Sequence, residues 1–434
     1  MMGMRPFQII LLAAFAVLAI IGLYVFSTYS GLTGGGTSVG TVTIWGTLPA
    51  GPVTNAIDTL SRSDKSYAAV RYVEHRPESF QTDLANALAA GQGPDLILIT
   101  QEQLLAELPL ITSIPFTSIP QRTYLDTYLS IDQLFLNSAG TYGIPLVVDP
   151  LVLYYNRPML ASAGAAQPPR SWEAATGLVP ALVKQDDRQA IQKSALPFGS
   201  YANVMNARAI LSLLFLQTGT SITGNTNAGI RSQLDSGQAS SATGNTGAVA
   251  ALNFFAQFAN PTRTLYSWNP SLPLSRQMFI AGDLAFYPGF ASERAGLRAA
   301  NPNLDFDMAP VPQPGTGSTK VTYGLAYVFA IPKVSSNAAG AFTTAFALSG
   351  DTILPTLAAE LGMAPAKAAL LTPSASDAYA SVYYPEAITA KGWLSPSPAA
   401  TDAVFSAMIT NVTSGRYDAA QALSAADQSL NAAL

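Results

Sequence analysis

Cysteine is absent from this chain of 434 residues, and histidine occurs once. Without cysteine the chain has no disulfides, no thiolate metal sites, no cysteine nucleophile, and no site for the lipid that bacterial lipoproteins carry. A single histidine, His75, excludes multi-histidine zinc sites and the H-E-x-x-H arrangement. We therefore expect no bound metal and no cofactor, and we interpret His75 as a polar residue at a strand exit.

Charge is also scarce, because Asp, Glu, Lys and Arg together make up 11% of the residues and the net charge is −4. A mildly acidic, charge-poor protein lacks the basic surface that phosphate backbones require, so we expect no nucleic-acid partner. Hydrophobic residues, in contrast, make up 49% of the chain. This is enough for a large core, and the length suggests two or three domains.

The first forty residues contain a run of twenty uncharged and mostly apolar residues, from Phe7 to Phe26. A helix of twenty residues spans about 30 Å, the thickness of a bilayer core. We predict a transmembrane anchor at 7–27, preceded by a cytoplasmic N-terminus (1–6) that carries Arg5 and followed by a linker rich in Gly, Ser and Thr (28–40). The alternative is a cleaved secretory signal. Both interpretations place the rest of the chain outside the cytoplasm.

Residues 41–100 alternate between strand and helix patterns. Three β-rich runs, Thr41–Trp45, Ala68–Val73 and Leu96–Ile99, are separated by stretches with apolar residues at helical spacing. The last run is apolar on both faces, which is typical of a buried parallel strand. The pattern predicts a β-α-β-α-β unit in a doubly wound sheet. Ligands bind beyond the carboxyl ends of such strands, where Trp45 and Glu102 lie.

Further along the chain, apolar runs predict helices at 203–217 and 336–350, and Asp418 is expected to cap a final helix. The sequence T-G-N-T occurs at 223–226 and again at 243–246. We interpret this echo as two surface loops of low charge.

Several stretches follow one another in a recognisable order. They are F-Q-T-D-L-A-N-A-L-A-A-G-Q-G-P-D-L-I-L-I at 80–99, Y-G-I-P-L-V-V-D-P-L-V-L-Y-Y-N-R-P-M-L at 142–160, P-P-R-S-W-E-A at 168–174, M-F-I-A-G-D-L-A-F-Y-P-G-F at 278–290 with D-F-D-M-A-P-V-P at 305–312, and Y-G-L-A-Y-V-F-A-I-P-K-V-S-S-N at 323–337. Their order and spacing resemble extracellular solute-binding protein family 1, the sugar-type substrate-binding components of ABC importers.

This resemblance implies an α/β, two-lobed fold of the periplasmic-binding-protein type (type II), with hinge strands between the lobes. The solute-binding domain would span 41–434. Its first lobe would comprise about 41–148 and 323–372, and its second lobe about 149–322 and 373–434. Ligand would bind in the cleft, and the lobes would close on it by hinge motion. The family usually begins with a lipoprotein cysteine or a cleaved signal, and this chain departs from that pattern.

A sugar offers apolar C–H faces and a rim of hydroxyls, which suit aromatic side chains and a few polar groups. At positions that correspond to the family's cleft we predict ligand contacts from Trp45, Tyr287 and Tyr323, and from the carboxylates of Asp149 and Glu102. Tyr201, Trp268 and Trp393, in loops between helical segments, are further candidates. Each aromatic residue has an alternative role in core or hinge packing, and Asp149, which precedes a proline, has one as a turn residue.

The leading hypothesis is a membrane-anchored extracellular or periplasmic receptor that captures a mono- or oligosaccharide and delivers it to ABC permease subunits, with no catalysis of its own. One alternative is an extracellular carbohydrate-active enzyme that uses two carboxylates, with Glu102 and Asp149 as the first suspects. Another is a sensing or scaffold domain of the same fold.

Overall fold

The computed structural model describes residues 39–236, 247–315, 319–373 and 377–434. The predicted anchor, most of the linker and the second T-G-N-T lie outside these residues. Among the helices within the described ranges, none combines the length and the apolar character needed to span a bilayer.

The N-terminal part of the described chain forms the predicted parallel unit. Its strands are β1 (Val42–Gly46), β2 (Val70–Glu74) and β3 (Leu96–Thr100), which α2 (Ala50–Ser63) and α3 (Phe80–Ala89) connect. β1 lies between β2 and β3 and pairs in parallel with both. All five residues of β3 are buried, as expected for a strand that is covered on both faces.

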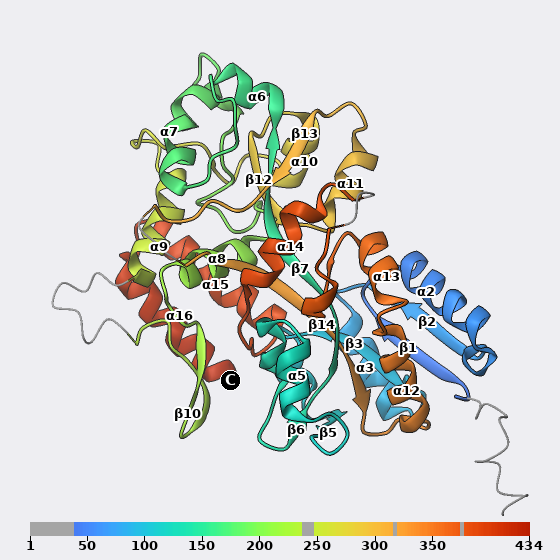
Figure 1. Cartoon of the computed structure of the whole chain (residues 1–434). Coiled ribbons are helices and arrows are strands. Elements are labelled where there is room, and N and C mark those ends of the chain that lie inside the picture. Colours follow the sequence, from blue (N-terminus) through green and yellow to red (C-terminus); the bar gives the residue numbers. More distant parts are fainter. Residues whose placement is uncertain (1–38, 237–246, 316–318, 374–376) are drawn as a thin grey trace, which may run out of the picture.

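Two long strands, β7 (Ile144–Asn156) and β14 (Thr322–Pro332), connect the two ends of the molecule. The sheet order is β12-β7-β14-β3-β1-β2. β7 changes partners along its length, because it pairs with β14 as far as Pro150 and with β12 (Phe286–Phe290) from Leu151 onward. Figure 1 shows helices and strands gathered at both ends of these two strands, which gives the two-lobed α/β architecture.

The remaining elements surround this framework (Figure 1). The other strands are β4 (Ile111–Thr112), β5 (Ile114–Pro115), β6 (Gly140–Thr141), β8 (Lys184–Gln185), β9 (Ile191–Lys193), β10 (Thr223–Thr226), β11 (Gly229–Ser232), β13 (Phe306–Ala309), β15 (Ala364–Pro365) and β16 (Ala390–Lys391). The other α-helices are α4 (Leu104–Glu107), α5 (Gln121–Thr127), α6 (Arg157–Ser162), α7 (Trp172–Leu182), α8 (Ala207–Gln217), α9 (Gly247–Ala256), α10 (Ser275–Ala281), α11 (Glu293–Ala300), α12 (Ala338–Leu348), α13 (Leu354–Leu361), α14 (Ala380–Thr389), α15 (Pro398–Thr413) and α16 (Ala419–Ala433). Short 3-10 turns are η1 (Lys65–Tyr67), η2 (Ser130–Phe135), η3 (Gln257–Ala259) and η4 (Ala368–Leu370).

Two local predictions are corrected by the structure. The helix expected from residue 203 begins only at Ala207, because Asn206 has a left-handed backbone (φ 61°) that a right-handed helix cannot contain. The T-G-N-T at 223–226 is not a loop but strand β10, which pairs antiparallel with β11. Cross-strand pairing decides strand formation there, although Gly224 and Asn225 have low strand propensity.

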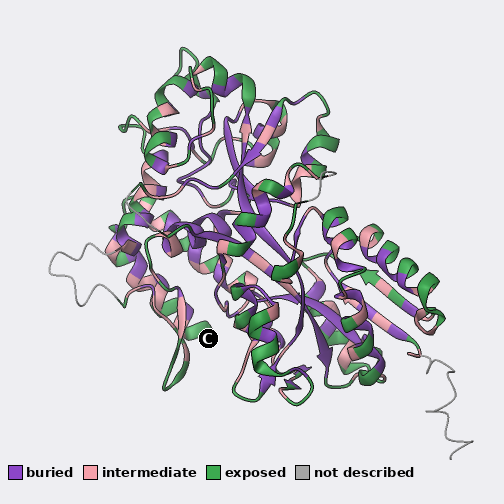
Figure 2. Cartoon of the chain, in the orientation of Figure 1, coloured by how far each residue is buried: buried purple, intermediate pink, exposed green. Residues whose placement is uncertain are grey.

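The central strands form the core, and Figure 2 shows β3, β7 and β14 buried along most of their length while the surrounding helices keep exposed outer faces. Two carboxyl groups are enclosed with the apolar side chains. Glu107 on α4 is 1% exposed and Asp132 in η2 is fully buried, and none of their carboxyl oxygens has a hydrogen-bond partner among the described residues. Burial raises the pKa of Glu107 to about 7 and that of Asp132 well above its ordinary value.

Candidate functional site

A cluster of charged side chains lies where the end of β3 meets α8. Glu102 follows β3, and Arg208 lies in the first turn of α8. The guanidinium of Arg208 donates to both carboxyl oxygens of Glu102, with an Nε–Oε1 distance of 3.1 Å and an Nη2–Oε2 distance of 2.8 Å. The hydroxyl of Tyr323, on β14, donates to Oε1 of the same carboxylate. A two-point contact of this kind fixes orientation as well as distance.

Arg208 also contacts a second carboxylate, that of Asp402 on α15. Its Nη1 atom lies 2.6 Å from Oδ2 of Asp402 and 3.2 Å from the carbonyl oxygen of Pro398. The hydroxyl of Tyr201 donates to Oδ1 of Asp402. The exposed fraction of the side chain rises from 5% at Glu102 to 21% at Arg208 and 47% at Asp402. The cluster is therefore closed at Glu102 and accessible to solvent at Asp402.

The ionisation of these groups follows from burial and pairing. Burial opposes the charge of Arg208, but the carboxylates of Glu102 and Asp402 more than offset it and raise the pKa of the guanidinium. Burial, and then the neighbouring carboxylates, raise the pKa values of Tyr201 and Tyr323 above the ordinary value for tyrosine. Both phenols therefore keep their protons at neutral pH and act as hydrogen-bond donors.

Asp149 lies on β7, directly before the point where that strand changes partners. Its carboxyl accepts hydrogen bonds from the backbone N–H (3.1 Å) and the hydroxyl (2.6 Å) of Ser292. Burial raises the pKa of Asp149 to about 7, although these hydrogen bonds act in the opposite direction. In this structure the carboxyl connects β7 to the residue before α11.

Two further predicted residues are enclosed by the protein's own atoms. Trp268 is fully buried and donates its indole N–H to Oδ1 of Asn203 (3.0 Å). Tyr287, on β12, is also fully buried, and its hydroxyl donates to Oε2 of Glu293 (2.5 Å). Both polar atoms thus have a partner inside the fold, as buried Trp and Tyr usually do.

Trp45 is partly buried at the carboxyl end of β1. Its ring centroid lies 4.1 Å from that of His75, which follows β2. The expected position of His75 at a strand exit is confirmed. The two rings cover the adjacent ends of β1 and β2, the edge where the sequence predicted a ligand.

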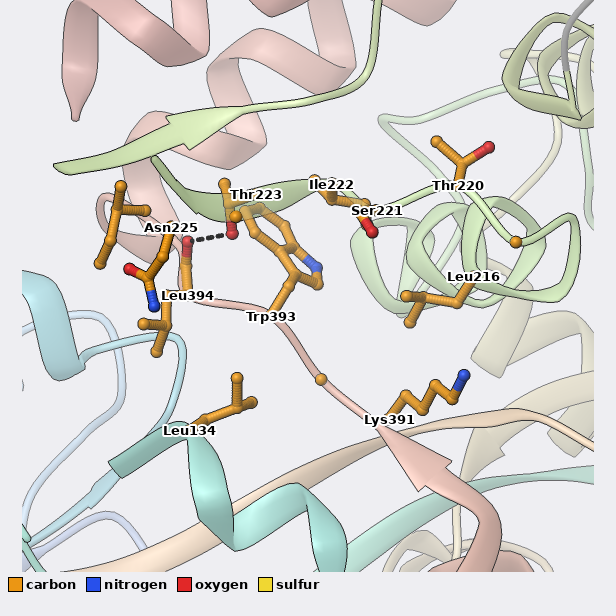
Figure 3. A pocket seen from close by; sticks show the side chains of 14 residues that line it. Leu134, Leu216, Thr220, Ser221, Ile222, Thr223, Asn225, Lys391, Trp393 and Leu394 are labelled. Atoms are coloured by element: carbon orange, nitrogen blue, oxygen red, sulfur yellow. Dashed lines mark hydrogen bonds between the residues drawn. The ribbon is translucent and has the colours of Figure 1, made fainter. Parts of the chain in front are cut away.

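Trp393 belongs to the wall of a cavity of about 280 Å³ (Figure 3). The cavity lies between Leu134 of η2, the β10–β11 hairpin, the end of α8 and the segment after β16, and its lining mixes Leu134 and Leu394 with polar groups such as Asn225 and Lys391. The indole N–H of Trp393 donates to the hydroxyl of a serine on α8 (2.9 Å). The ring is 2% exposed.

Three of the predicted residues, Glu102, Tyr201 and Tyr323, therefore converge on one cluster, and the other five do not hydrogen-bond to it. Sequence reasoning missed Arg208 and Asp402. An arginine inside a strongly apolar helical run was a signal for the first, because arginine is seldom buried unless it is paired. No comparable signal marked Asp402. Among the described residues, no group of three or more His, Cys, Asp and Glu side chains is arranged to hold a metal ion.

Solved structures match nearly the whole chain. A cyclo/maltodextrin-binding protein complexed with maltotetraose is 17% identical, with a TM-score of 0.71 over 92% of this chain and 98% of that chain. The GacH receptor of Streptomyces glaucescens, solved unliganded and with acarbose, is 15% identical, with a TM-score of 0.70 over 91% and 98%. A solute-binding protein from Thermotoga lettingae bound with α-D-tagatose is 18% identical, with a TM-score of 0.69 over 91% and 99%. At these identities the likeness shows a common fold.

Comparison with curated proteins finds no match. The profile of one family, described as bacterial extracellular solute-binding protein, matches residues 67–381, well over half of the chain. The resemblance noted in the sequence is thereby confirmed, and this chain belongs to the family of bacterial extracellular solute-binding proteins.

Proposed function

We propose that this protein captures a carbohydrate outside the cytoplasm and delivers it to the permease of an ABC importer. The observation that carries this proposal is the fold. Over more than nine-tenths of the chain it matches binding proteins that were solved with maltotetraose and with acarbose. Both ligands are oligosaccharides, and domain interfaces are where small-molecule sites are expected.

The ligand would bind where the two lobes meet, next to the cluster of Glu102, Arg208 and Asp402. With a first lobe of 41–148 and 323–372 and a second lobe of 149–322 and 373–434, Glu102 belongs to the first lobe and Arg208 and Asp402 to the second. The half-exposed carboxylate of Asp402 would accept directional hydrogen bonds of the kind that sugar hydroxyls donate. Trp45 and Tyr201, which keep partly exposed rings, would offer apolar contact to the C–H faces.

Ligand affinity would be coupled to movement of the lobes through β7 and β14. These strands pair with each other over several residues, with a register shift between Tyr327 and Val328. A few residues in such connecting strands absorb the change in backbone angles when domains close. The ligand would favour the closed form because it contacts both lobes only there, and the permease would recognise that form.

The geometry supports binding without catalysis. A carboxylate pair at Glu102 and Asp149 was the sequence-based alternative for an enzyme. In the structure Glu102 is held by Arg208 and Tyr323, and Asp149 is held by Ser292. Neither carboxyl is free to act as nucleophile or proton donor. Both are better explained as groups whose hydrogen bonds hold parts of the fold together.

We further propose that residues 7–27 anchor the protein in the cell membrane, with the N-terminus cytoplasmic. The uncharged run from Phe7 to Phe26 and the location implied by the family support this. Fractionation of cells that express the full chain, compared with a chain starting at residue 39, tests the anchor. Recovery of the full chain only in the soluble fraction would contradict it.

Isothermal titration of the purified full chain with a panel of mono- and oligosaccharides tests the binding function. We expect a saturable heat for at least one oligosaccharide, and a weaker response after Arg208→Met. No response to any saccharide, with a response to peptides or polyamines, would refute the carbohydrate assignment.

A further inference from the structure

The hydrogen-bond donors of the Glu102–Arg208–Asp402 cluster are mostly used within the protein. A guanidinium has five N–H groups. Three of those on Arg208 donate hydrogen bonds, two to Glu102 and one to the carbonyl oxygen of Pro398, and Nη1 also forms the ion pair with Asp402. The phenols of Tyr201 and Tyr323 each donate to a carboxylate. An incoming ligand therefore finds very few donors here.

Acceptor capacity remains, and it is concentrated at Asp402. Two ionised carboxylates offer about eight acceptor positions in total, and four of these accept hydrogen bonds from Arg208, Tyr201 and Tyr323. At Asp402, Oδ1 accepts one hydrogen bond, Oδ2 forms the ion pair with Arg208, and 47% of the side chain is exposed. Glu102, at 5% exposed, is out of reach. The accessible chemistry of the cluster is thus a half-exposed carboxylate with unused lone pairs.

The net charge of the cluster also favours a ligand group that is positively charged. Two carboxylates share the single cation of Arg208, and within the described ranges no second Lys or Arg forms an ion pair with either of them. Lys391, on β16, pairs in the sheet register with Tyr323 on β14. Its side chain lines the cavity of Figure 3 and forms no ion pair with the cluster. The cluster therefore contains one more carboxylate than it has paired cations.

We propose that the carbohydrate captured here carries a protonated amine, which binds Asp402, so that the substrate class is an amino sugar or an oligosaccharide that contains one. This inference rests on the function proposed above and narrows it. An ammonium offers three donors and no acceptor, which complements a site whose own donors are mostly engaged. A neutral hydroxyl fits less well, and a uronate would bring acceptors and negative charge to a carboxylate.

The test is a titration of the full chain with matched tetrasaccharides at mildly acidic pH. The β-1,4-linked glucosamine tetramer and cellotetraose differ only at carbon 2, where an ammonium replaces a hydroxyl. The C6-oxidised uronate of cellotetraose is the third probe. We expect the glucosamine tetramer to bind about tenfold more tightly than cellotetraose, the difference between a charge-assisted and a neutral hydrogen bond. The uronate should bind most weakly.

The Asp402→Asn variant retains an acceptor oxygen but removes the charge, so the preference for the amine should shrink to less than about threefold. Asp126→Asn is the matched control, because Asp126 is a 70% exposed partner of Arg122 on α5, and it should keep the preference. If Asp402→Asn fails to fold, the ionic-strength dependence of the wild-type preference replaces it, since a charge-assisted contact at a half-exposed carboxylate weakens with salt.

Equal or weaker binding of the glucosamine tetramer, tightest binding of the uronate, a preference unchanged in Asp402→Asn, or a wild-type preference unaffected by salt would each overturn this inference while leaving a carbohydrate-binding function in place. Failure of every saccharide to bind would instead refute the proposed function itself.

Discussion

Replacement of Glu107 by glutamine should stabilise the protein at alkaline pH and leave it unchanged at acid pH. The side chain is 1% exposed, and its carboxyl oxygens have no hydrogen-bond partner in the described part of the chain. An ionised carboxylate in such a place is costly, and burial accordingly raises its pKa from 4.5 to about 7. Glutamine has nearly the shape of the protonated acid and cannot ionise.

The size of the effect follows from proton linkage. In the unfolded chain Glu107 ionises at its ordinary pKa of 4.5, and in the folded protein only near 7. Between these values the unfolded state releases a proton that the folded state retains, so the free energy of unfolding falls as the pH rises. A difference of about 2.5 pKa units corresponds to about 3 kcal/mol, lost from the wild type by about pH 8 and not from Glu107→Gln.

Urea denaturation followed by tryptophan fluorescence, at about pH 4 and about pH 8, measures this difference. Other buried acids such as Asp132 are present in both proteins, so their contributions cancel in the comparison. Glu78→Gln is the control, because Glu78 is exposed and its replacement should change stability little at either pH. A variant less stable than the wild type at pH 8, or a stability gap independent of pH, would refute the reasoning.

Three further substitutions test particular contacts by urea denaturation. Arg208→Met should lower the free energy of unfolding by about 3–5 kcal/mol, because it leaves the buried carboxylate of Glu102 without its cationic partner. A loss below about 1 kcal/mol would show that the ion pair behaves as a surface contact. Gly143→Ala should cost about 1–3 kcal/mol, since the new Cβ would lie 2.4 Å from Cγ2 of Val328 on β14. Unchanged stability would show that the side chain of Val328 moves aside and that this contact is not tightly packed. Gly177→Ala, inside α7 with no atom within 4 Å of the new methyl group, should add about 0.5–1 kcal/mol, and a loss would contradict the helical assignment.

Local patterns predicted much of the fold. The β-α-β-α-β order was visible because a run such as Leu96–Ile99 is apolar on both faces, and only a covered parallel strand accommodates that. Asp418 was recognised as a cap for a similar reason, since capping involves neighbours a few residues away. The structure confirms a capping box in which Asp418 and Gln421 satisfy each other's backbone N–H groups.

The cluster could not be predicted in this way. Glu102 and Arg208 are 106 residues apart, and Tyr201 and Asp402 are 201 apart. No spacing rule applies to such separations, and with 26 acidic residues in the chain any of them could be nominated as a partner. The tertiary fold brings these segments together, because Glu102 follows β3, Arg208 lies on α8 and Asp402 lies on α15.

The aromatic candidates show a second limit of the sequence. Tyr287 and Tyr323 were predicted to contact ligand because they correspond to the family's cleft positions, and Trp268 and Trp393 because they lie in loops between helical segments. Each is at most 2% exposed in the structure. A large ring whose polar atom finds an internal partner is as favourable in a core as at a ligand site, and both roles leave the same trace in the sequence.

The contact between Glu102 and Arg208 has consequences for opening of the lobes. In the proposed division it joins the two lobes, so separating them must break it. Opening also admits water to both groups, and hydration then compensates for most of the lost attraction, as it does for exposed ion pairs. Removing one partner by mutation gives no such compensation while the lobes stay together, which is why Arg208→Met is expected to be costly. A packed apolar interface would resist opening over its whole area, whereas an ion pair that water can replace allows the lobes to part and close again around a ligand.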